Sequence, residues 1–323
     1  YSAISLICPY IFYFFLKEKY KKIDLNILFL FSLVIFMFPT FRSSAIWANT
    51  QITAIIFFLI SLYYFTIWDS KKSINLNLIF MLFFMALAVY TRQEYSLPYL
   101  YFVFYFYREL KFDQFIKTCL IIFLLAVPGL ILVYFNPALI PMYLNIDIFD
   151  SLLVNLSILS FYLIPIFIII YLLNRKAKNI NIKNCIIGLF ISLIVVGICA
   201  INFNYNFKMG GGFFIKASII LFKNLYFFYF TSFLGLFFIY LLSLENRNNL
   251  ILSLILIFGF SSYVIFQKYF EPMFFLLLFL VYKTELTKNL LIKKTNVILF
   301  QFYFFIYLSA ALLNDYFAIT KSL

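Results

Sequence analysis

Histidine is absent from this sequence of 323 residues, and its absence narrows the chemistry open to the protein. Acid–base catalysis by imidazole, histidine metal ligands and Ser-His-Asp triads are all excluded. Any proton transfer therefore falls to Asp, Glu, Lys or Tyr. Charged residues are also scarce, at 11% of the chain, against about 25% in an ordinary globular domain.

Cysteine is rare as well, and the few cysteines show no functional spacing. Neither the pairing of a disulfide framework nor the spacing of a metal site is present. They lie within or at the ends of apolar runs, at Cys8, Cys119, Cys185 and Cys199. We interpret them as packing residues.

Apolar side chains fill most of the sequence instead. Hydrophobic residues make up 66% and aromatic residues 24% of the chain, and the mean hydropathy is +1.03. A water-soluble fold cannot cover so much apolar surface, and no shift in composition marks a domain boundary. We therefore predict an all-α integral membrane protein, a polytopic helical bundle that forms a single transmembrane domain over residues 1–323.

About twelve apolar runs qualify as membrane spans, because a spanning helix needs roughly 20 residues and shorter runs suffice where the bilayer thins. The predicted spans are residues 1–16, 25–41, 49–68, 76–91, 95–107, 118–136, 152–173, 185–203, 219–243, 250–266, 269–282 and 296–314. The runs at 95–107 and 269–282 are short.

The net charge of +13 fits membrane topology better than nucleic-acid binding, because the basic residues form no continuous stripe. Alternate loops hold 18 of the 25 Lys and Arg residues, and the positive-inside rule places these loops in the cytoplasm. They are residues 17–22, 69–72, 108–117, 174–183, 245–249 and 283–294. The remaining seven basic residues then lie outside, as do both ends of the chain.

One candidate site is the turn TRQEYSLP at residues 91–98. Arg92 offers a planar guanidinium that matches a phosphate, and Glu94 offers a proton acceptor or a partner for sugar hydroxyls. Gln93 and Tyr95 adjoin them as further substrate-binding candidates. An Arg–Glu pair that only anchors a tight turn is the open alternative.

A second turn, FQKYFEPM at residues 266–273, repeats this chemistry with a cation, an amide, a phenol and a carboxylate. Lys268 and Tyr269 are candidates for substrate binding, and Glu271 is a candidate proton acceptor. An ordinary interfacial loop with a snorkelling lysine is the alternative.

A third segment, residues 38–51, begins with Pro39, which loosens the helix ahead of Arg42. Such a break exposes backbone groups that need a partner at that depth, so Arg42 is a candidate at the edge of a lipid-phosphate site. A simple hairpin loop explains the segment equally well.

Two further loops carry weaker signals. In residues 204–218, three consecutive glycines between Lys208 and Lys216 allow an anion-binding loop or a hinge. In residues 136–151, two acids three residues apart make a divalent metal possible, although two ligands do not define a site. These acids are Asp147 and Asp150.

The order of these segments resembles the C-type (GT-C) glycosyltransferases, multi-helix membrane enzymes that use sugars linked to a polyprenyl phosphate. The stretch YSAISLICPYIFYFFLKEKYKK resembles the helix after that family's catalytic loop. FPTFRSSAIWANTQITAIIFFLISLYYF and MALAVYTRQEYSLPYLYFVFYFYREL resemble the next two hairpins, and FQKYFEPMFFLLLFL resembles the late basic-aromatic turn. The Arg-Gln pair of TRQEY also resembles the dolichyl-phosphate-glucose alpha-1,2-glucosyltransferases.

The resemblance implies a GT-C module in residues 1–136 that lacks its first helix and catalytic acidic loop, followed by variable helices in residues 137–323. It implies transfer of a sugar from a polyprenyl-phosphate donor to a lipid-linked glycan or other envelope acceptor, with Arg92 and Lys268 on the donor phosphate. The active site then faces the non-cytoplasmic side of an inner or plasma membrane, or of the endoplasmic reticulum. We expect this chain to be truncated and inactive alone, and we expect no nucleic-acid partner.

Three other functions stay open. A transporter or lipid flippase predicts charges near mid-membrane and an internal repeat. An envelope polysaccharide polymerase predicts a large outer loop late in the chain, and a structural membrane protein predicts that the polar turns lie apart.

Overall fold

A computed structural model describes residues 2–47, 49–136, 147–173, 182–205, 210–260 and 264–322, with side chains described in these ranges except at residues 172–173 and 314–322. Every regular element in these ranges is a helix, which confirms the all-α prediction. The elements are α1 (Ser2–Ser5), α2 (Ile7–Lys19), α3 (Leu25–Ser32), η1 (Leu33–Met37), α4 (Pro39–Ile46), α5 (Gln51–Asp69), α6 (Leu76–Thr91), η2 (Gln93–Tyr95), α7 (Ser96–Glu109), α8 (Phe112–Phe135), α9 (Ile148–Phe167), η4 (Ile168–Leu173), α10 (Ile182–Ile201), α11 (Gly212–Ala217), η5 (Ser218–Phe222), α12 (Tyr226–Glu245), α13 (Arg247–Gly259), η6 (Gln267–Tyr269), α14 (Met273–Leu280), α15 (Glu285–Ile292) and α16 (Lys294–Ser322).

Several of these helices suit a membrane. Within the described ranges, six are long and apolar enough to cross one: Gln51–Asp69, Phe112–Phe135, Ile148–Tyr171, Ile182–Ile201, Tyr226–Glu245 and Lys294–Leu313. A seventh span arises if the pair Leu25–Met37 and Pro39–Ile46, bent by 72°, counts as one. The fold is therefore that of a multi-pass membrane protein, but the predicted count of twelve spans is not confirmed.

Other predicted spans form helices that are shorter than a membrane-spanning helix. The run at 76–91 becomes the 16-residue α6, and the run at 269–282 becomes the eight-residue α14. At 1.5 Å per residue they reach about 24 Å and about 12 Å, against roughly 30 Å of hydrocarbon. The run at 219–243 is interrupted, because η5 ends at Phe222, Lys223 adopts a φ of 55°, and α12 begins at Tyr226.

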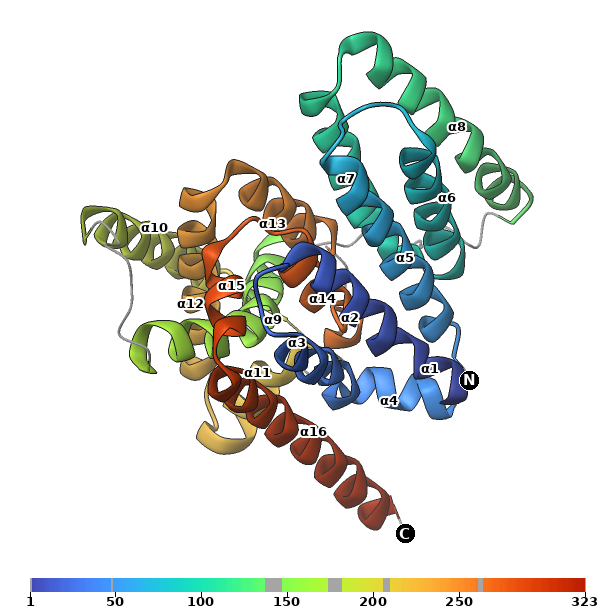
Figure 1. Ribbon diagram of the computed structural model, residues 1–323. Coiled ribbons are helices and arrows are strands. Elements are labelled where there is room, and N and C mark those ends of the chain that lie inside the picture. Colours follow the sequence, from blue (N-terminus) through green and yellow to red (C-terminus); the bar gives the residue numbers. More distant parts are fainter. Residues whose placement is uncertain are drawn as a thin grey trace.

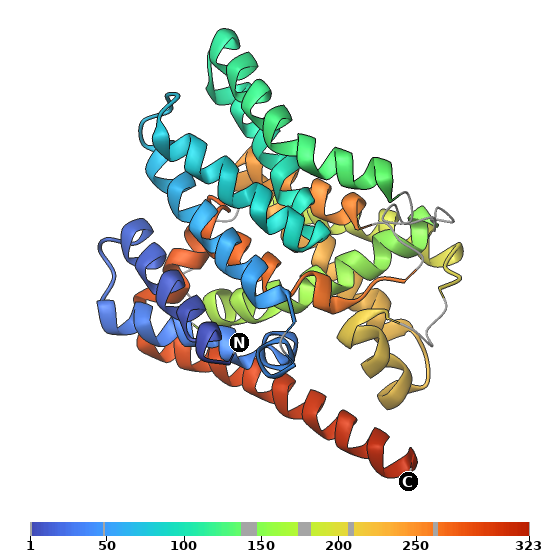
Figure 2. The ribbon, with the colours of Figure 1, turned by 90° about the vertical axis from the view of Figure 1, so that its right-hand side faces the viewer.

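Helix α14 forms the centre of the molecule. All eight of its residues are buried, and the Phe275 ring packs against Phe12, Phe38 and Phe304 at centroid distances of 5.6, 5.1 and 6.4 Å. Figures 1 and 2 show α8 along one side of the molecule and α16 along the opposite side. The central helix is thus shielded from lipid by the longer helices around it.

Loops predicted to share the cytoplasmic side lie together at one end of the molecule. Lys283 pairs with Asp69 at 3.3 Å, Arg108 donates to Asn248 at 2.5 Å, and Tyr20 donates to Thr287 at 3.1 Å. With the Glu285 N–H donating to Glu245 at 2.9 Å, these contacts connect five of the six basic loops; most of the sixth lies outside the described ranges. We call this the basic end, formed by residues 17–22, 69–72, 108–117, 245–249 and 283–294.

Polar caps explain why helices restart at this end. Side chains accept backbone N–H groups at the starts of α3, α6, α13 and α15, satisfying donors that have no partner within a helix. The caps are Asp24, Asn75, Asn246 and Thr284.

Candidate functional site

The polar turns that the sequence places outside the cytoplasm meet around Glu271. The backbone N–H of Thr40 donates to the Glu271 carboxylate at 3.4 Å, and Gln51 Nε2 donates to its backbone carbonyl at 2.8 Å. The N–H of Phe213 donates to Gln267 Oε1 at 2.7 Å. We call this the Glu271 end, formed by residues 38–51, 92–95, 210–213 and 264–272.

Glu271 itself is only 1% exposed. The hydroxyl of Tyr307 on α16 donates to Oε1 at 2.7 Å, and Gln267 Nε2 lies 3.4 Å from the same oxygen. Burial raises the pKa of the Glu271 carboxyl, while hydrogen bonds from Tyr307 and Thr40 oppose this shift. The structure therefore places this proton-acceptor candidate inside the protein, away from any open surface.

Arg92 and Glu94 form an ion pair with each other. Arg92 Nε and Nη2 both approach Glu94 Oε1 at 2.8 Å, and the two side chains are 21% and 12% exposed. This is the turn-anchoring arrangement left open from the sequence. It leaves Arg92 Nη1 without a partner in the described part of the chain, so a role in phosphate binding stays a prediction.

The other two candidates of that turn differ in exposure. Gln93 is exposed at the surface. Tyr95 is 1% exposed, and its ring packs against Phe58 with 4.8 Å between centroids. Tyr95 is therefore a packing residue as placed here.

Lys268 and Arg42 are the exposed cations of the Glu271 end. Lys268 Nζ lies 4.5 Å from the Phe266 ring centroid and 5.8 Å from that of Tyr269. Among the described side chains, neither cation forms an ion pair with a carboxylate. Both are thus available to an anion.

The turn at 92–95 lies near the turn at 267–269. Leu97, just after the first turn, packs so closely on Gly259 that a Cβ there would lie 2.3 Å from it, and the neighbouring Phe260 ring lies 6.2 Å from the Tyr269 ring. The pKa of Tyr269 is raised by burial and then by the charge of Glu94, while Arg92 lowers it. The two sequence-predicted turns are therefore close, and the Thr40–Glu271 contact ties α4, which carries Arg42, to the same end.

The glycine loop packs on this site rather than presenting free amides. Gly210, Gly211 and Gly212 all have positive φ, and the Gly211 N–H donates to the Ile265 carbonyl at 2.8 Å. A Cβ on Gly210 would meet that carbonyl oxygen at 2.5 Å. The N–H groups of Gly211 and Phe213 are both occupied, which favours close packing over anion binding. Lys216 is exposed, and Lys208 lies outside the described ranges.

The acids of the 136–151 loop are also engaged. Asp147 accepts the N–H groups of Phe149 and Asp150 at 2.9 and 3.3 Å, and Asp150 accepts the Asn204 N–H at 2.8 Å. Residues 137–146 lie outside the described ranges. No group of three or more acidic or cysteine side chains able to hold a metal occurs where the structure is described.

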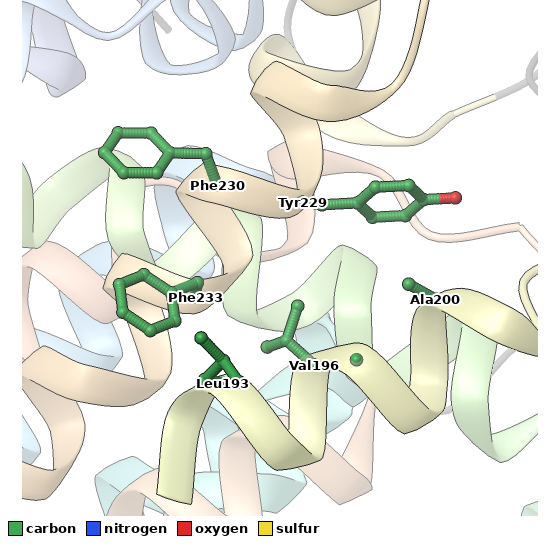
Figure 3. Close-up of a pocket in the computed structure, with 7 residues that line it drawn as sticks. Leu193, Val196, Ala200, Tyr229, Phe230 and Phe233 are labelled. Atoms are coloured by element: carbon green, nitrogen blue, oxygen red, sulfur yellow. The ribbon is translucent and has the colours of Figure 1, made fainter. Parts of the chain in front are cut away.

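Helices α10 and α12 enclose an apolar groove of about 360 Å³ (Figure 3). Its lining comes from Leu193, Val196, Gly197, Ala200, Tyr229, Phe230 and Phe233. These residues belong to the half of each helix nearer the Glu271 end. The chain after α10 reaches that end, where Tyr205 accepts the Ile265 N–H at 3.0 Å, and α12 ends with Glu245 at the basic end. The sequence gives no signal for this groove, since it depends on how two separate helices pack.

Tyr307 also escapes detection in the sequence, whereas Gln51 belongs to the predicted segment 38–51. They contact Glu271 across 36 and 220 positions. The sequence contains 26 tyrosines, so Tyr307 within an apolar run gives no distinct signal.

Neither a protein-family model, nor a curated protein, nor a solved structure matches the chain. The chemistry of the site is therefore argued from its residues.

Proposed function

We propose that the protein is a membrane glycosyltransferase that moves a sugar from a polyprenyl-phosphate donor to a lipid-linked glycan or other envelope acceptor. The observation that carries this proposal is the meeting of three cation-bearing segments at the Glu271 end. Among the described side chains, Lys268 and Arg42 are exposed there without carboxylate partners, and Arg92 lies in the adjoining turn. Cations at one end of the molecule suit a lipid phosphate that carries one negative charge as the phosphodiester donor and gains a second as the released monophosphate.

The positive-inside rule assigns the basic end to the cytoplasm, and we infer that the Glu271 end faces toward the opposite, non-cytoplasmic side. Five basic loops gather at the basic end, as the contacts of Asp69, Tyr20, Asn248 and Glu245 indicate. This supports a donor site on the face where polyprenyl-linked sugars are consumed.

Lys268 and Arg42 would act on the donor phosphate. Their positive charges stabilise the negative charge that develops on the departing phosphate as the sugar is transferred. The apolar groove between α10 and α12, in the half nearer this site, offers room for part of a polyprenyl chain.

The carboxylate that deprotonates the acceptor is expected in a loop outside these residues. Glu94 is held by Arg92, and Glu271 is buried under Tyr307. Neither is positioned to meet an acceptor hydroxyl, so the cations form the better-supported part of the site.

Binding of farnesyl phosphate, a short-chain polyprenyl phosphate, to this chain in lipid nanodiscs tests the proposal. A charge-assisted contact with phosphate contributes about 1.5–3 kcal/mol. We expect Lys268→Ala to weaken binding at least tenfold, and Arg42→Ala by a similar factor. Lys288→Ala and Lys294→Ala are matched controls, because these lysines are exposed at the basic end.

Equal losses at the two ends would show that the lysines attract the anion non-specifically. Unchanged binding in both Lys268→Ala and Arg42→Ala would contradict the proposed phosphate site.

A further inference from the structure

Glu271 is a buried carboxylate with no cation paired to it in the part of the chain that the structure describes. Its side chain is 1% exposed, and no ion pair within the described ranges includes it. A buried charge without a partner is costly, and such a group persists only where hydrogen bonds satisfy it. Glu271 therefore needs the contacts that surround it.

Those contacts are all hydrogen-bond donors. The Tyr307 hydroxyl and the Gln267 amide donate to Oε1, and the Thr40 backbone N–H donates to Oε2. The bond from Tyr307, at 2.7 Å, is the strongest by length. The Gln267 Nε2 amide and the Thr40 N–H can only donate, which fits an ionised carboxylate, whereas the Tyr307 hydroxyl can also accept from a protonated one.

The donors come from three elements that are distant in the sequence: the start of α4, the turn η6 and the middle of α16. The backbone of Glu271 adds a fourth, because its carbonyl accepts Gln51 Nε2 from α5. Gln51 also accepts the hydroxyl of Ser44, which returns the network to α4 at 3.0 Å. Glu271 thus connects α4, the second half of the bent pair, to the turn η6.

Both exposed cations sit next to this junction. Arg42 follows Thr40 by two positions, and Lys268 directly follows Gln267. We propose that Glu271 is a positioning residue that fixes the α4 start relative to η6, and so sets the spacing of Arg42 and Lys268. The effect of Glu271 on phosphate binding rests on the proposed function, whereas its contacts with α4 and η6 do not.

A distance measurement between spin labels tests the junction without any ligand. Labels at Ser43→Cys and Lys268→Cys, in a chain whose natural cysteines are replaced, report the separation of the two turns. We expect one narrow distance distribution, broadened at least twofold by Tyr307→Phe and by Glu271→Gln. The glutamine amide would set an N–H against donors where the carboxylate accepts them.

Asp69→Asn is the matched control, because Asp69 accepts a tyrosine hydroxyl, that of Tyr105, at 2.5 Å at the basic end. It should leave the distribution unchanged. The proposal is overturned if both Glu271 and Tyr307 variants keep the narrow distribution, or if Asp69→Asn broadens it equally.

Farnesyl phosphate binding by Glu271→Gln, with Lys268 intact, separates this proposal from the proposed function. A fivefold or greater loss, together with broadening, supports both. Broadening in a chain that binds no farnesyl phosphate supports the positioning role and removes the phosphate site.

Discussion

Single residues divide into those whose charge is satisfied and those whose charge is free. The carboxylates of Asp69, Glu94, Asp150 and Glu271 all have hydrogen-bond or ionic partners inside the protein. Lys268, by contrast, is exposed over two aromatic rings and forms no ion pair among the described side chains. The available chemistry of the Glu271 end is therefore cationic.

Small residues also decide how closely two of the spans approach. Gly235 on α12 lies so near α9 that a Cβ there would collide with the Leu156 carbonyl oxygen. The Ser232 hydroxyl beside it donates to the Leu153 carbonyl at 2.9 Å. Membrane helices associate closely through such small residues.

Gly235→Ala should therefore destabilise the protein by about 2 kcal/mol, because the backbone oxygen cannot move aside. Gly197→Ala is the control, since nothing lies within 4 Å of the added carbon. That variant should be neutral or slightly stabilising, as alanine favours helix. Thermal unfolding in detergent measures both, and equal melting temperatures for the two variants would contradict the close contact.

Among the elements, α14 has the role of a central core rather than that of a lipid-facing span. Its residues are all buried, and longer helices lie on both sides of it. Lys19 also caps its far end, donating to the Phe279 and Tyr282 carbonyls at 2.9 and 3.2 Å. The position of Glu271, which precedes α14, depends on this core.

Phe275→Ala should cost about 3 kcal/mol of folding free energy, because it leaves a cavity among aromatic rings. Phe302→Ala provides the comparison: Phe302 is 59% exposed on α16, where lipid replaces the lost contacts. Its stability should change little. Urea or thermal unfolding of both variants in one detergent distinguishes a buried core helix from a lipid-facing one, for which the two losses would be similar.

Helix type could be predicted from the sequence, whereas helix ends and breaks could not. Long apolar runs indicate helices, because a helix satisfies the hydrogen bonds of its own backbone N–H and C=O groups inside a membrane. The break at Pro39 follows from proline chemistry, yet Pro128 and Pro165 lie inside α8 and α9 without ending them. The interruption at Lys223 falls in a continuous apolar run and depends on tertiary packing.

The candidate site was predictable only in its local parts. The Arg92–Glu94 pair joins residues two positions apart, so the sequence could suggest it. The contact of Glu271 with Thr40 spans 231 positions and becomes visible only when the chain folds. Exposure also depends on the tertiary fold. The sequence made Tyr95 and Lys268 equal candidates for substrate binding, although Tyr95 is buried and Lys268 is exposed.

At the scale of the whole molecule, the protein has two chemically different ends. Basic loops gather at the basic end, and mixed polar turns gather around Glu271. If these ends lie on opposite sides of a membrane, single cysteines should react accordingly. In a chain without natural cysteines, an impermeant maleimide on intact cells should label Ser43→Cys and Gln93→Cys.

Lys21→Cys and Lys288→Cys should react only after permeabilisation. Labelling of these two from outside, or of only one of positions 43 and 93, would contradict the assignment of the ends.

The central claim is that the Glu271 end recognises a lipid phosphate. Its most direct test compares the affinities of farnesyl phosphate and farnesol for the unaltered chain in the same nanodiscs. The two ligands share the apolar chain and differ only in the phosphate. We predict that farnesyl phosphate binds at least tenfold more tightly and that the difference shrinks at high salt, because the added contacts are ionic. Equal affinity for the two ligands would contradict the account.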